Sequence, residues 1–478
     1  MDGLREGIHR RVSGPPPPAK KKNTNAELER IAKNREERRL KAAQDKEARE
    51  KHQKRLEDMG CPGDVDFQLM IEDFRRTKKL IRQHSPPGDS KICICIRKRP
   101  INQKEVAVRD YDSVTNWNPQ VLVHYCKLKV DGITKYLDNA SFEFDHTFGE
   151  DDDTYDIYKY TCAPLVPFTV GGGRATVFAY GQTGSGKTYT MQGIQEYVTR
   201  DLFEAMAAHP RGARLQVSVA FFEIYGGRCQ DLLNRRHRLQ VREDGQGEVQ
   251  IVDLQEMPCE DAAALEAYVQ RGNRNRTTHA TEKNDVSSRS HAVCQIALRE
   301  VGSGRLQGKI SLIDLAGSER GADTKSHNRQ RRMESAEINK SLLALKECIR
   351  ALDSNDTHIP YRASKLTLVL KDSFTNKSSA RTVMIATVAP NASSADHTIN
   401  TLRYADRVKE KKVGGRAGQR MPVVERAGGG GGAKGEGDED DDGGAPSRAA
   451  DARAQLAEAK ANGAGAEGGP RGAWAKGG

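Results

Sequence analysis

Apolar residues in the middle of the chain follow two spacings, one typical of strands and one typical of helices. Short apolar runs of the kind found in buried strands occupy residues 91–97, 175–180, 215–225, 308–315 and 382–388. Between several of these runs, apolar residues recur at intervals of three or four, which indicates helices with one buried face. The alternation extends over residues 91–411 and predicts an α/β domain.

Two further helices are expected ahead of this domain. More than half of residues 24–60 are charged, and acids precede bases by four positions, as in Asp45–Arg49, which favours one long solvated helix. Residues 61–90 contain a stripe of apolar side chains at helical spacing, which predicts a neck helix that docks on another surface: Phe67, Met70, Ile71, Phe74 and Ile81.

The two ends of the chain have compositions that do not support a packed core. Residues 1–23 hold four consecutive prolines and then Lys20–Lys22, so we expect disorder there, with nuclear import left open by the lysines. Of the 45 glycines in the 478-residue chain, 19 lie in residues 411–478. Residues 412–478 therefore read as a disordered Gly/Ala-rich tail.

Charge and composition narrow the class of partner. The net charge of +11 suits nucleic acid, an acidic membrane face or an acidic protein polymer. Aromatic residues make up only 5% of the chain, which disfavours single-stranded nucleic acid, and no apolar run reaches the ~18–20 residues of a membrane helix. The nine cysteines form no CxxC pair, so we expect free thiols in a reducing compartment, with Cys93 and Cys95 in the core.

One motif carries nucleotide chemistry in full. GQTGSGKT, residues 181–188, fits GxxxxGK[ST], follows an apolar strand and precedes a helix, which is the context that a phosphate-binding loop requires. Its backbone N–H groups would surround the phosphates, Lys187 would reach the β- and γ-phosphates, and the Thr188 hydroxyl would bind Mg²⁺.

Two later motifs complete a hydrolysis site. Asp314 ends an apolar strand and suits a water-mediated contact to Mg²⁺, and Gly317 can bring its N–H close to a γ-phosphate. The run NDVSSRSH, residues 284–291, is rich in hydroxyls and carries one arginine, as a loop that senses the γ-phosphate would.

The order of these motifs resembles the kinesin motor domain. RKRP at residues 97–100, GQTGSGKT, NDVSSRSH and DLAGSE at residues 314–319 occur in the order and approximate spacing of that family, over residues 91–411. The resemblance implies a P-loop NTPase kinesin motor fold with a central mixed β-sheet flanked by helices, an N-terminal helical neck and a disordered C-terminal tail. It also implies hydrolysis of ATP with Mg²⁺ as cofactor.

The same resemblance assigns expected roles to individual residues. Nucleotide contacts are expected from Arg97, Arg99, Pro100, Gly181, Gln182, Thr183, Gly184, Ser185, Gly186, Lys187, Thr188 and Tyr189, with Arg97 and Pro100 at the adenine. Hydrolysis is expected to use Ser287, Ser288, Arg289, Gly317 and Glu319, and Mg²⁺ to use Thr188, Ser288 and, through water, Asp314. Arg289 and Glu319 are expected to form an ion pair when the two loops close.

Three further segments resemble the kinesin-13 class, whose members depolymerise microtubules. They are the tip Lys129–Val130–Asp131, the triplet Lys346–Glu347–Cys348 and the neck around Phe67–Arg75, with Gly132 and Ile133 adding one residue that we expect to loosen the tip. Tubulin contacts are expected from these two triplets and from a basic set: Lys325, Arg329, Arg331, Arg332, Arg362 and Lys365. The first four of this set are expected in a loop.

We therefore expect an ATP-hydrolysing motor that removes tubulin from microtubule ends. A motile kinesin is the alternative, although the chain after residue 409 has no heptad pattern. A non-catalytic microtubule-binding protein and another P-loop enzyme such as a GTPase also stay open. No nucleic-acid or membrane partner is expected; a homodimer through the flanking regions is left open. The expected location is the cytoplasmic microtubule cytoskeleton, including the spindle.

Overall fold

The computed structural model describes residues 24–58, 60, 63–77, 84, 92–245, 247, 249–277, 288–319, 329–353, 356–371 and 379–409. The strands are β1 Ile92–Lys98, β2 Val114–Trp117, β3 Gln120–Leu128, β4 Lys135–Glu143, β5 His146–Phe148, β6 Arg174–Tyr180, β7 Leu215–Tyr225, β8 Arg228–Asp231, β9 His237–Glu243, β10 Val249–Val252, β11 Met257–Cys259, β12 His291–Glu300, β13 Leu306–Asp314 and β14 Ala380–Val388.

The α-helices are α1 Thr24–Asp58, α2 Val65–Thr77, α3 Gln103–Ala107, α4 Thr154–Ile157, α5 Leu165–Val170, α6 Lys187–Ala208, α7 Ala262–Thr277, α8 Arg329–Asp353, α9 Lys365–Val369 and α11 Ala395–Lys409. Short turns of other helix types lie at η1 Tyr158–Cys162, η2 Gly212–Arg214, η4 Tyr361–Ala363 and η5 Ala392–Ser394. In the described part of the chain, no helix combines the length and the apolar character needed to span a bilayer.

The centre of the fold is a mixed sheet, as predicted. Its strands run in the order β10-β9-β8-β7-β12-β13-β6-β14-β1-β5, and β11 pairs with β7. The strands from β13 to β5 are parallel neighbours, whereas β7, β12 and β13 pair antiparallel. In the parallel half, the carboxyl ends of β6, β13 and β14 meet at one edge, where loops that bind ligands commonly lie.

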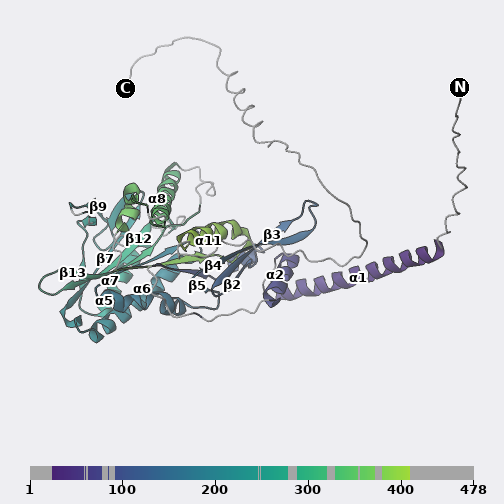
Figure 1. Ribbon diagram of the computed structural model, residues 1–478, viewed down its shortest axis with the longest axis horizontal. Helices are drawn as coiled ribbons and strands as arrows, with labels where there is room; N and C mark the ends of the chain where they lie inside the picture. Colours follow the sequence, from purple (N-terminus) through teal and green to yellow (C-terminus); the bar gives the residue numbers. More distant parts are fainter. Residues whose placement is uncertain are drawn as a thin grey trace, which may run out of the picture. The chain divides into compact units, whose positions relative to one another are not determined.

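Helices cover both faces of this sheet (Figure 1). Side chains alternate between the faces along each strand. In β6, Val177 packs in the core cluster under α5, α6 and α7, while Phe178 packs in the cluster under α8, α9 and α11. Cys95 is fully buried in the first cluster and Cys93 packs against it, as predicted. Every cysteine in the described ranges is a free thiol.

The neck helix α2 docks on a second, three-stranded sheet formed by β2, β3 and β4. Phe67 and Ile71 of its predicted stripe are buried. The Lys135 ammonium at the start of β4 pairs with the carboxylates of Asp64 and Asp66, at 2.6 and 2.8 Å. The helix ends at Thr77, and Ile81, the last residue of the predicted stripe, lies outside the described residues.

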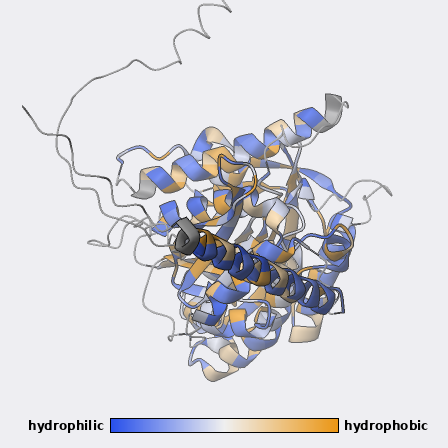
Figure 2. Ribbon diagram, turned by 90° about the vertical axis from the view of Figure 1, so that its right-hand side faces the viewer, coloured by the Kyte–Doolittle hydropathy of each residue, from blue (hydrophilic) through white to orange (hydrophobic). Residues whose placement is uncertain are grey.

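The long helix α1 is hydrophilic over most of its length (Figure 2). Only its C-terminal part contacts α2, where Leu56 is buried and Arg49 Nη2 lies 3.0 Å from Asp66 Oδ2. Besides its helical spacing from Asp45, Arg49 thus binds a carboxylate on the neighbouring helix.

Candidate functional site

The phosphate-binding loop joins β6 to α6 and depends on glycine. Gly181, Gly184 and Gly186 have φ angles of +156°, +77° and +98°, which other residues rarely adopt. A Cβ on Gly181 would lie 2.3 Å from the carbonyl oxygen of Thr387 in β14, so a larger residue would push the loop off the sheet. The Ser185 hydroxyl is 2.7 Å from the Thr387 hydroxyl and anchors the loop to the same strand.

Lys187 lies inside the loop that it follows. Its side chain is buried, and its ammonium donates to the carbonyl oxygens of Gly181 and Gln182 at 3.0 and 2.8 Å. This places a fixed positive charge beside the backbone N–H groups at the start of α6. Charge and donors together make an anion site suited to phosphate.

Thr188 and Asp314 meet beneath this loop. The Thr188 hydroxyl donates to Asp314 Oδ2 at 2.6 Å, and the buried Arg276 guanidinium pairs with the same oxygen. The other oxygen of Asp314 is buried without a hydrogen-bond partner. A hydroxyl and an unused carboxylate oxygen are hard ligands of the kind that hydrated Mg²⁺ takes, so these residues fit the expected metal.

At the predicted adenine edge, a buried arginine lies beneath an exposed tyrosine. Arg97 is only 8% exposed, and its guanidinium donates to the hydroxyls of Thr154 and Thr190 and lies over the Tyr189 ring, 5.2 Å from its centre. Tyr189 is 69% exposed. Arg97 thus supports the Tyr189 ring, whose other face is open, and the contact of Arg97 with adenine stays a prediction.

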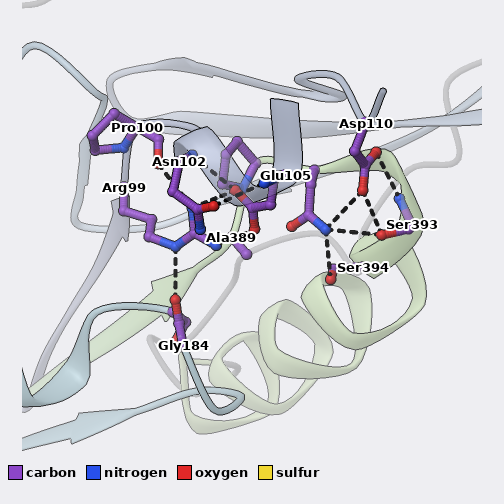
Figure 3. Close-up of polar contacts among 12 residues, drawn as sticks. Arg99, Pro100, Asn102, Glu105, Asp110, Gly184, Ala389, Ser393 and Ser394 are labelled. Atoms are coloured by element: carbon purple, nitrogen blue, oxygen red, sulfur yellow. Dashed lines mark hydrogen bonds and ion pairs between the residues drawn. The ribbon is translucent and has the colours of Figure 1, made fainter. Parts of the chain in front are cut away.

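Arg99 connects this edge to the phosphate-binding loop (Figure 3). Its Nε donates to the Gly184 carbonyl oxygen at 2.7 Å, and its guanidinium also pairs with Glu105. Asn102 caps the short helix α3 that carries Glu105, so the carboxylate is held in place by the fold. Pro100, next in the chain, is exposed.

The two loops expected to sense the γ-phosphate touch each other at the site. Gly317 N–H donates to the Ser288 carbonyl oxygen at 2.8 Å, and Ser318 N–H donates to the Gly181 carbonyl oxygen at 3.0 Å. Ser287 lies outside the described residues. The backbone of DLAGSE is thus joined both to the arginine-bearing loop and to the phosphate-binding loop.

The expected ion pair between Arg289 and Glu319 is not formed in this structure. The Glu319 carboxylate accepts from the Thr183 N–H at 2.9 Å and from the Thr183 hydroxyl. Arg289 Nη1 lies 3.4 Å from Glu334 Oε2 in α8. Glu319 is thus bonded to a residue of the phosphate-binding loop, and Arg289 is bonded to Glu334, which no sequence motif indicated.

Three residues outside the motifs were missed. Arg276 binds Asp314, Glu334 binds Arg289, and Tyr225 binds Glu334. The basic run Arg274–Arg276, ahead of NDVSSRSH, was the available signal for Arg276, whereas the other two depend on tertiary contacts.

His291, the last residue of NDVSSRSH, links two elements of the site. Its ring joins the Ser341 hydroxyl of α8 and accepts from the Ala316 N–H. Burial lowers the pKa of His291 to about 3, so the ring is neutral.

The predicted tubulin tip is a tight, exposed turn between β3 and β4. Val130 is fully exposed, and the Asp131 carboxylate accepts from the N–H groups of Ile133 and Thr134 at 2.9 and 2.8 Å. Gly132 has a φ of +69° in this turn. The added residue is therefore accommodated by a hydrogen-bonded turn, and the tip projects a bare valine.

The residues of the second predicted triplet, Lys346–Glu347–Cys348, lie on different sides of α8. Cys348 is fully buried, so its predicted contact with tubulin is wrong: it lies on the core side of α8, as do Leu345 and Ile349. Lys346 is half-buried. Glu347 pairs with Arg350 at 2.8 Å.

The basic set is placed mainly on α8 and α9. Arg329, Arg331 and Arg332 belong to α8, which begins at Arg329, so the prediction of a loop for them is wrong. Arg332 is exposed, and Lys325 lies outside the described residues. Of the remaining two, the exposed Arg362 pairs with Glu243 at 2.6 Å, and Lys365 is the first residue of α9.

Comparison with known proteins gives a clear match. The family model described as the kinesin motor domain matches residues 97–411. The diatom spindle kinesin-1 of Cylindrotheca fusiformis is 54% identical over 402 residues, which are 82% of this chain and 64% of that protein. The chain spans 64% of the length of this relative, so the activity and partners of the longer protein are matters for proposal.

These matches decide part of what the sequence predicts. The kinesin motor fold is confirmed, and proteins of this family bind nucleotide. The individual site residues and the hydrolysis of ATP stay predictions. Neither match supports the kinesin-13 class.

Proposed function

Because the chain belongs to the kinesin motor domain family, we propose that it hydrolyses ATP and uses the energy to act on microtubules. The observation that carries the proposal is the convergence of three motifs in one site: the Lys187 cradle, the Thr188–Asp314 pair and the Gly317–Ser288 contact. The test is ATP turnover by purified protein with and without microtubules, with Lys187→Ala as the matched inactive variant. Turnover that microtubules do not raise would contradict it.

Each part of the site has a separate task in this proposal. The loop N–H groups and Lys187 would bind the phosphates, and Thr188, Ser288 and, through water, Asp314 would hold Mg²⁺. The metal, when bound, neutralises negative charge on the β- and γ-phosphates. Gly317 and the two serines 287 and 288 position the attacking water. Catalysis then rests on positioning and charge, without a covalent enzyme intermediate.

The proposed partner is tubulin, and the proposed location is the spindle. The word spindle in the relative's name supports the location. Exposed cations on α8 and beside α9, such as Arg332 and Arg362, suit an acidic filament surface. Neither comparison supports the nuclear import that Lys20–Lys22 left open, and those lysines lie outside the described residues.

Two outputs on the filament have specific support. Taken as a class label, the number in the relative's name favours directed movement, the alternative that the sequence left open, over shortening at the ends. End shortening is the second candidate, favoured by the exposed tip at Val130 and by a neck helix that precedes the motor and docks beside the same hairpin through Lys135.

One imaging experiment separates the two outputs. Labelled, stabilised microtubules are placed on a surface coated with the protein in ATP, and both their translocation and their length are recorded. Steady gliding at constant length supports movement. Loss of length from the ends without gliding supports shortening.

A further inference from the structure

The carboxylate of Glu334 occupies a central position between the sheet and the arginine-bearing loop. It lies in the second turn of α8, and its side chain is 10% exposed. One oxygen accepts from the Tyr225 hydroxyl at 2.7 Å, and the other lies 3.4 Å from Arg289 Nη1. Burial and the bond to Glu334 raise the pKa of Tyr225 to about 12, so the tyrosine stays protonated and can donate.

The catalytic partner proposed for Arg289 is bonded elsewhere at the same time. Glu319 accepts from the backbone and the hydroxyl of Thr183 in the phosphate-binding loop. For Arg289 and Glu319 to meet, the guanidinium has to leave Glu334 and the carboxylate has to leave Thr183. The structure therefore shows one of two mutually exclusive pairings.

We infer that Glu334 is a positioning residue that competes with Glu319 for Arg289 and keeps the hydrolytic ion pair open until α8 moves. This inference rests on the proposed ATPase function. Tyr225 in β7 fixes one carboxylate oxygen, so Glu334 moves away from Arg289 only when the start of α8 shifts relative to the sheet. The same helix carries the exposed Arg332 and the half-buried Lys346, both expected to meet tubulin. A filament that binds the shifted helix better would release Arg289 and favour hydrolysis.

The decisive variant is Glu334→Gln. Its amide oxygen can still accept from Tyr225, but it no longer attracts the Arg289 guanidinium by charge. We expect turnover without microtubules to rise by about fivefold or more, the lower end of typical coupling between sites, while turnover with saturating microtubules changes little. The ratio of turnover with microtubules to turnover without them therefore falls. The matched control is Glu337→Gln, which removes the same charge from an exposed position one turn along α8 and should leave both rates unchanged.

Two further variants distinguish competition from simple support. Tyr225→Phe loosens Glu334 without removing its charge and should give a smaller rise in the same direction. Glu334→Gln combined with Glu319→Ala should lose the gain, because Arg289 then has no second carboxylate to join. Thermal unfolding of each variant shows whether the fold is retained.

The outcomes are separable. Unchanged or reduced basal turnover in a folded Glu334→Gln protein, with normal wild-type hydrolysis, would overturn the competition while the ATPase function stands. A wild-type protein that binds ATP but never hydrolyses it would overturn the proposed function itself.

Discussion

Lys187 and Glu319 make different contacts in the site, so their loss should produce different defects. Lys187→Ala removes a buried ammonium beside the phosphate cradle, and a charge-assisted hydrogen bond of about 1.5–3 kcal/mol corresponds to roughly 10–100-fold weaker nucleotide binding. Glu319→Ala should keep nucleotide affinity and lose microtubule-stimulated turnover by about 10²-fold or more, as the removal of other transition-state groups does. Titration with a fluorescent nucleotide and ATPase rates measure the two effects. Near-wild-type turnover in Glu319→Ala would contradict the proposed ion pair of Glu319 with Arg289 during hydrolysis.

Two buried histidines make the folded state sensitive to acid. Burial lowers the pKa of His291 to about 3 and that of His124 to about 4, below the ordinary value near 6.5. Both rings bind protons more tightly in the unfolded chain than in the folded one. Their contribution to the free energy of unfolding is therefore complete above about pH 6.5 and is lost as the pH falls toward their pKa values in the folded state. At pH 5.5 each histidine should lower the free energy of unfolding by about 1 kcal/mol relative to pH 7.

Urea unfolding at pH 7 and pH 5.5 measures this loss. His124→Gln removes one titrating ring while keeping an amide that can bond to Thr115 and Asn139, the present partners of the ring. Its unfolding midpoint should shift less between the two pH values than that of the wild type. Equal shifts in the two proteins would mean that His124 does not titrate differently in the folded and unfolded states.

Sequence motifs located the residues of the nucleotide site better than they located the partners of those residues. Lys187 and Thr188 belong to one short loop whose geometry is fixed locally by glycine, so their positions follow from the pattern. Arg289 carries a long side chain that can reach several carboxylates, and the choice of Glu334 depends on where α8 begins. The predicted tubulin contact of Cys348 was wrong for a related reason, since a shift of one position along a helix moves a side chain between the core and the surface.

At the scale of elements, one arginine of α2 adds several polar contacts to the docking of this helix. Arg75 donates to the Asp112 carboxylate at 2.9 Å, to the Thr115 hydroxyl and to the Val114 carbonyl oxygen. Burial acts to raise the pKa of Asp112, but Lys98 and Arg75 outweigh it and hold the pKa below its ordinary value. Arg75→Ala should therefore weaken the docking, and amide hydrogen exchange in α2 should accelerate by about tenfold or more.

The neighbouring arginine provides the control for this measurement. Arg76 is exposed, and its guanidinium pairs with Asp73 in the same helix at 2.6 Å. Arg76→Ala keeps the contacts of α2 with the sheet, so its exchange should resemble the wild type. Similar acceleration in both variants would show that helix stability, rather than docking, sets the exchange rate.

The charged arm formed by residues 1–48 should act through long-range attraction. It carries 13 Lys and Arg against 8 Asp and Glu, a net charge of +5, and its removal spares Arg49 and Leu56, which contact α2. Deletion should slow association with microtubules at low salt and have little effect at ~0.15 M, where the Debye length is about 8 Å. Stopped-flow binding over a salt series tests this. An unchanged rate at low salt would exclude electrostatic steering by the arm.

Element positions were predictable where the pattern was long and periodic. The strands at residues 175–180 and 215–225 appear as β6 and β7 within one residue. The first residues of α8, from Arg329, were expected in a loop because they include few apolar residues. The pairing of β2, β3 and β4 into a separate sheet depends on contacts with α2 and α11 that no local pattern encodes.

At the scale of the motor domain, nucleotide chemistry and the expected filament contacts occupy different elements. The phosphate site lies at the carboxyl ends of β6 and β13, while the expected tubulin residues lie on α8, α9 and the β3–β4 hairpin. The contact of Arg289 with Glu334 links the site to α8. Among the described residues, we find no ion pair of this kind between the hairpin tip and the nucleotide site. Changes at the tip should therefore alter the mechanical output without altering hydrolysis.

Replacing Lys129, Val130 and Asp131 with alanines tests this separation. Basal and microtubule-stimulated ATPase rates should stay close to the wild type, because the phosphate-binding loop, the loops of NDVSSRSH and DLAGSE, and α8 are unchanged. If the motor shortens filaments, the loss of the exposed tip should abolish shortening, since a bent tubulin junction would lose its recognition surface. If the motor moves along filaments, gliding speed should persist. The matched control replaces Val301 and Ser303 in the exposed β12–β13 turn, which should preserve either output.

The combination of the two measurements decides between the outputs. A wild type that shortens filaments and a tip variant that hydrolyses ATP without shortening them would assign the hairpin to end recognition and make the neck-first arrangement functional. A wild type that glides filaments at constant length, with a tip variant that glides equally fast, would leave the hairpin as ordinary surface and establish directed movement. A tip variant that shortens ends as fast as the wild type would show that recognition of the bent lattice lies elsewhere, with α8 and its exposed Arg332 as the next element to test.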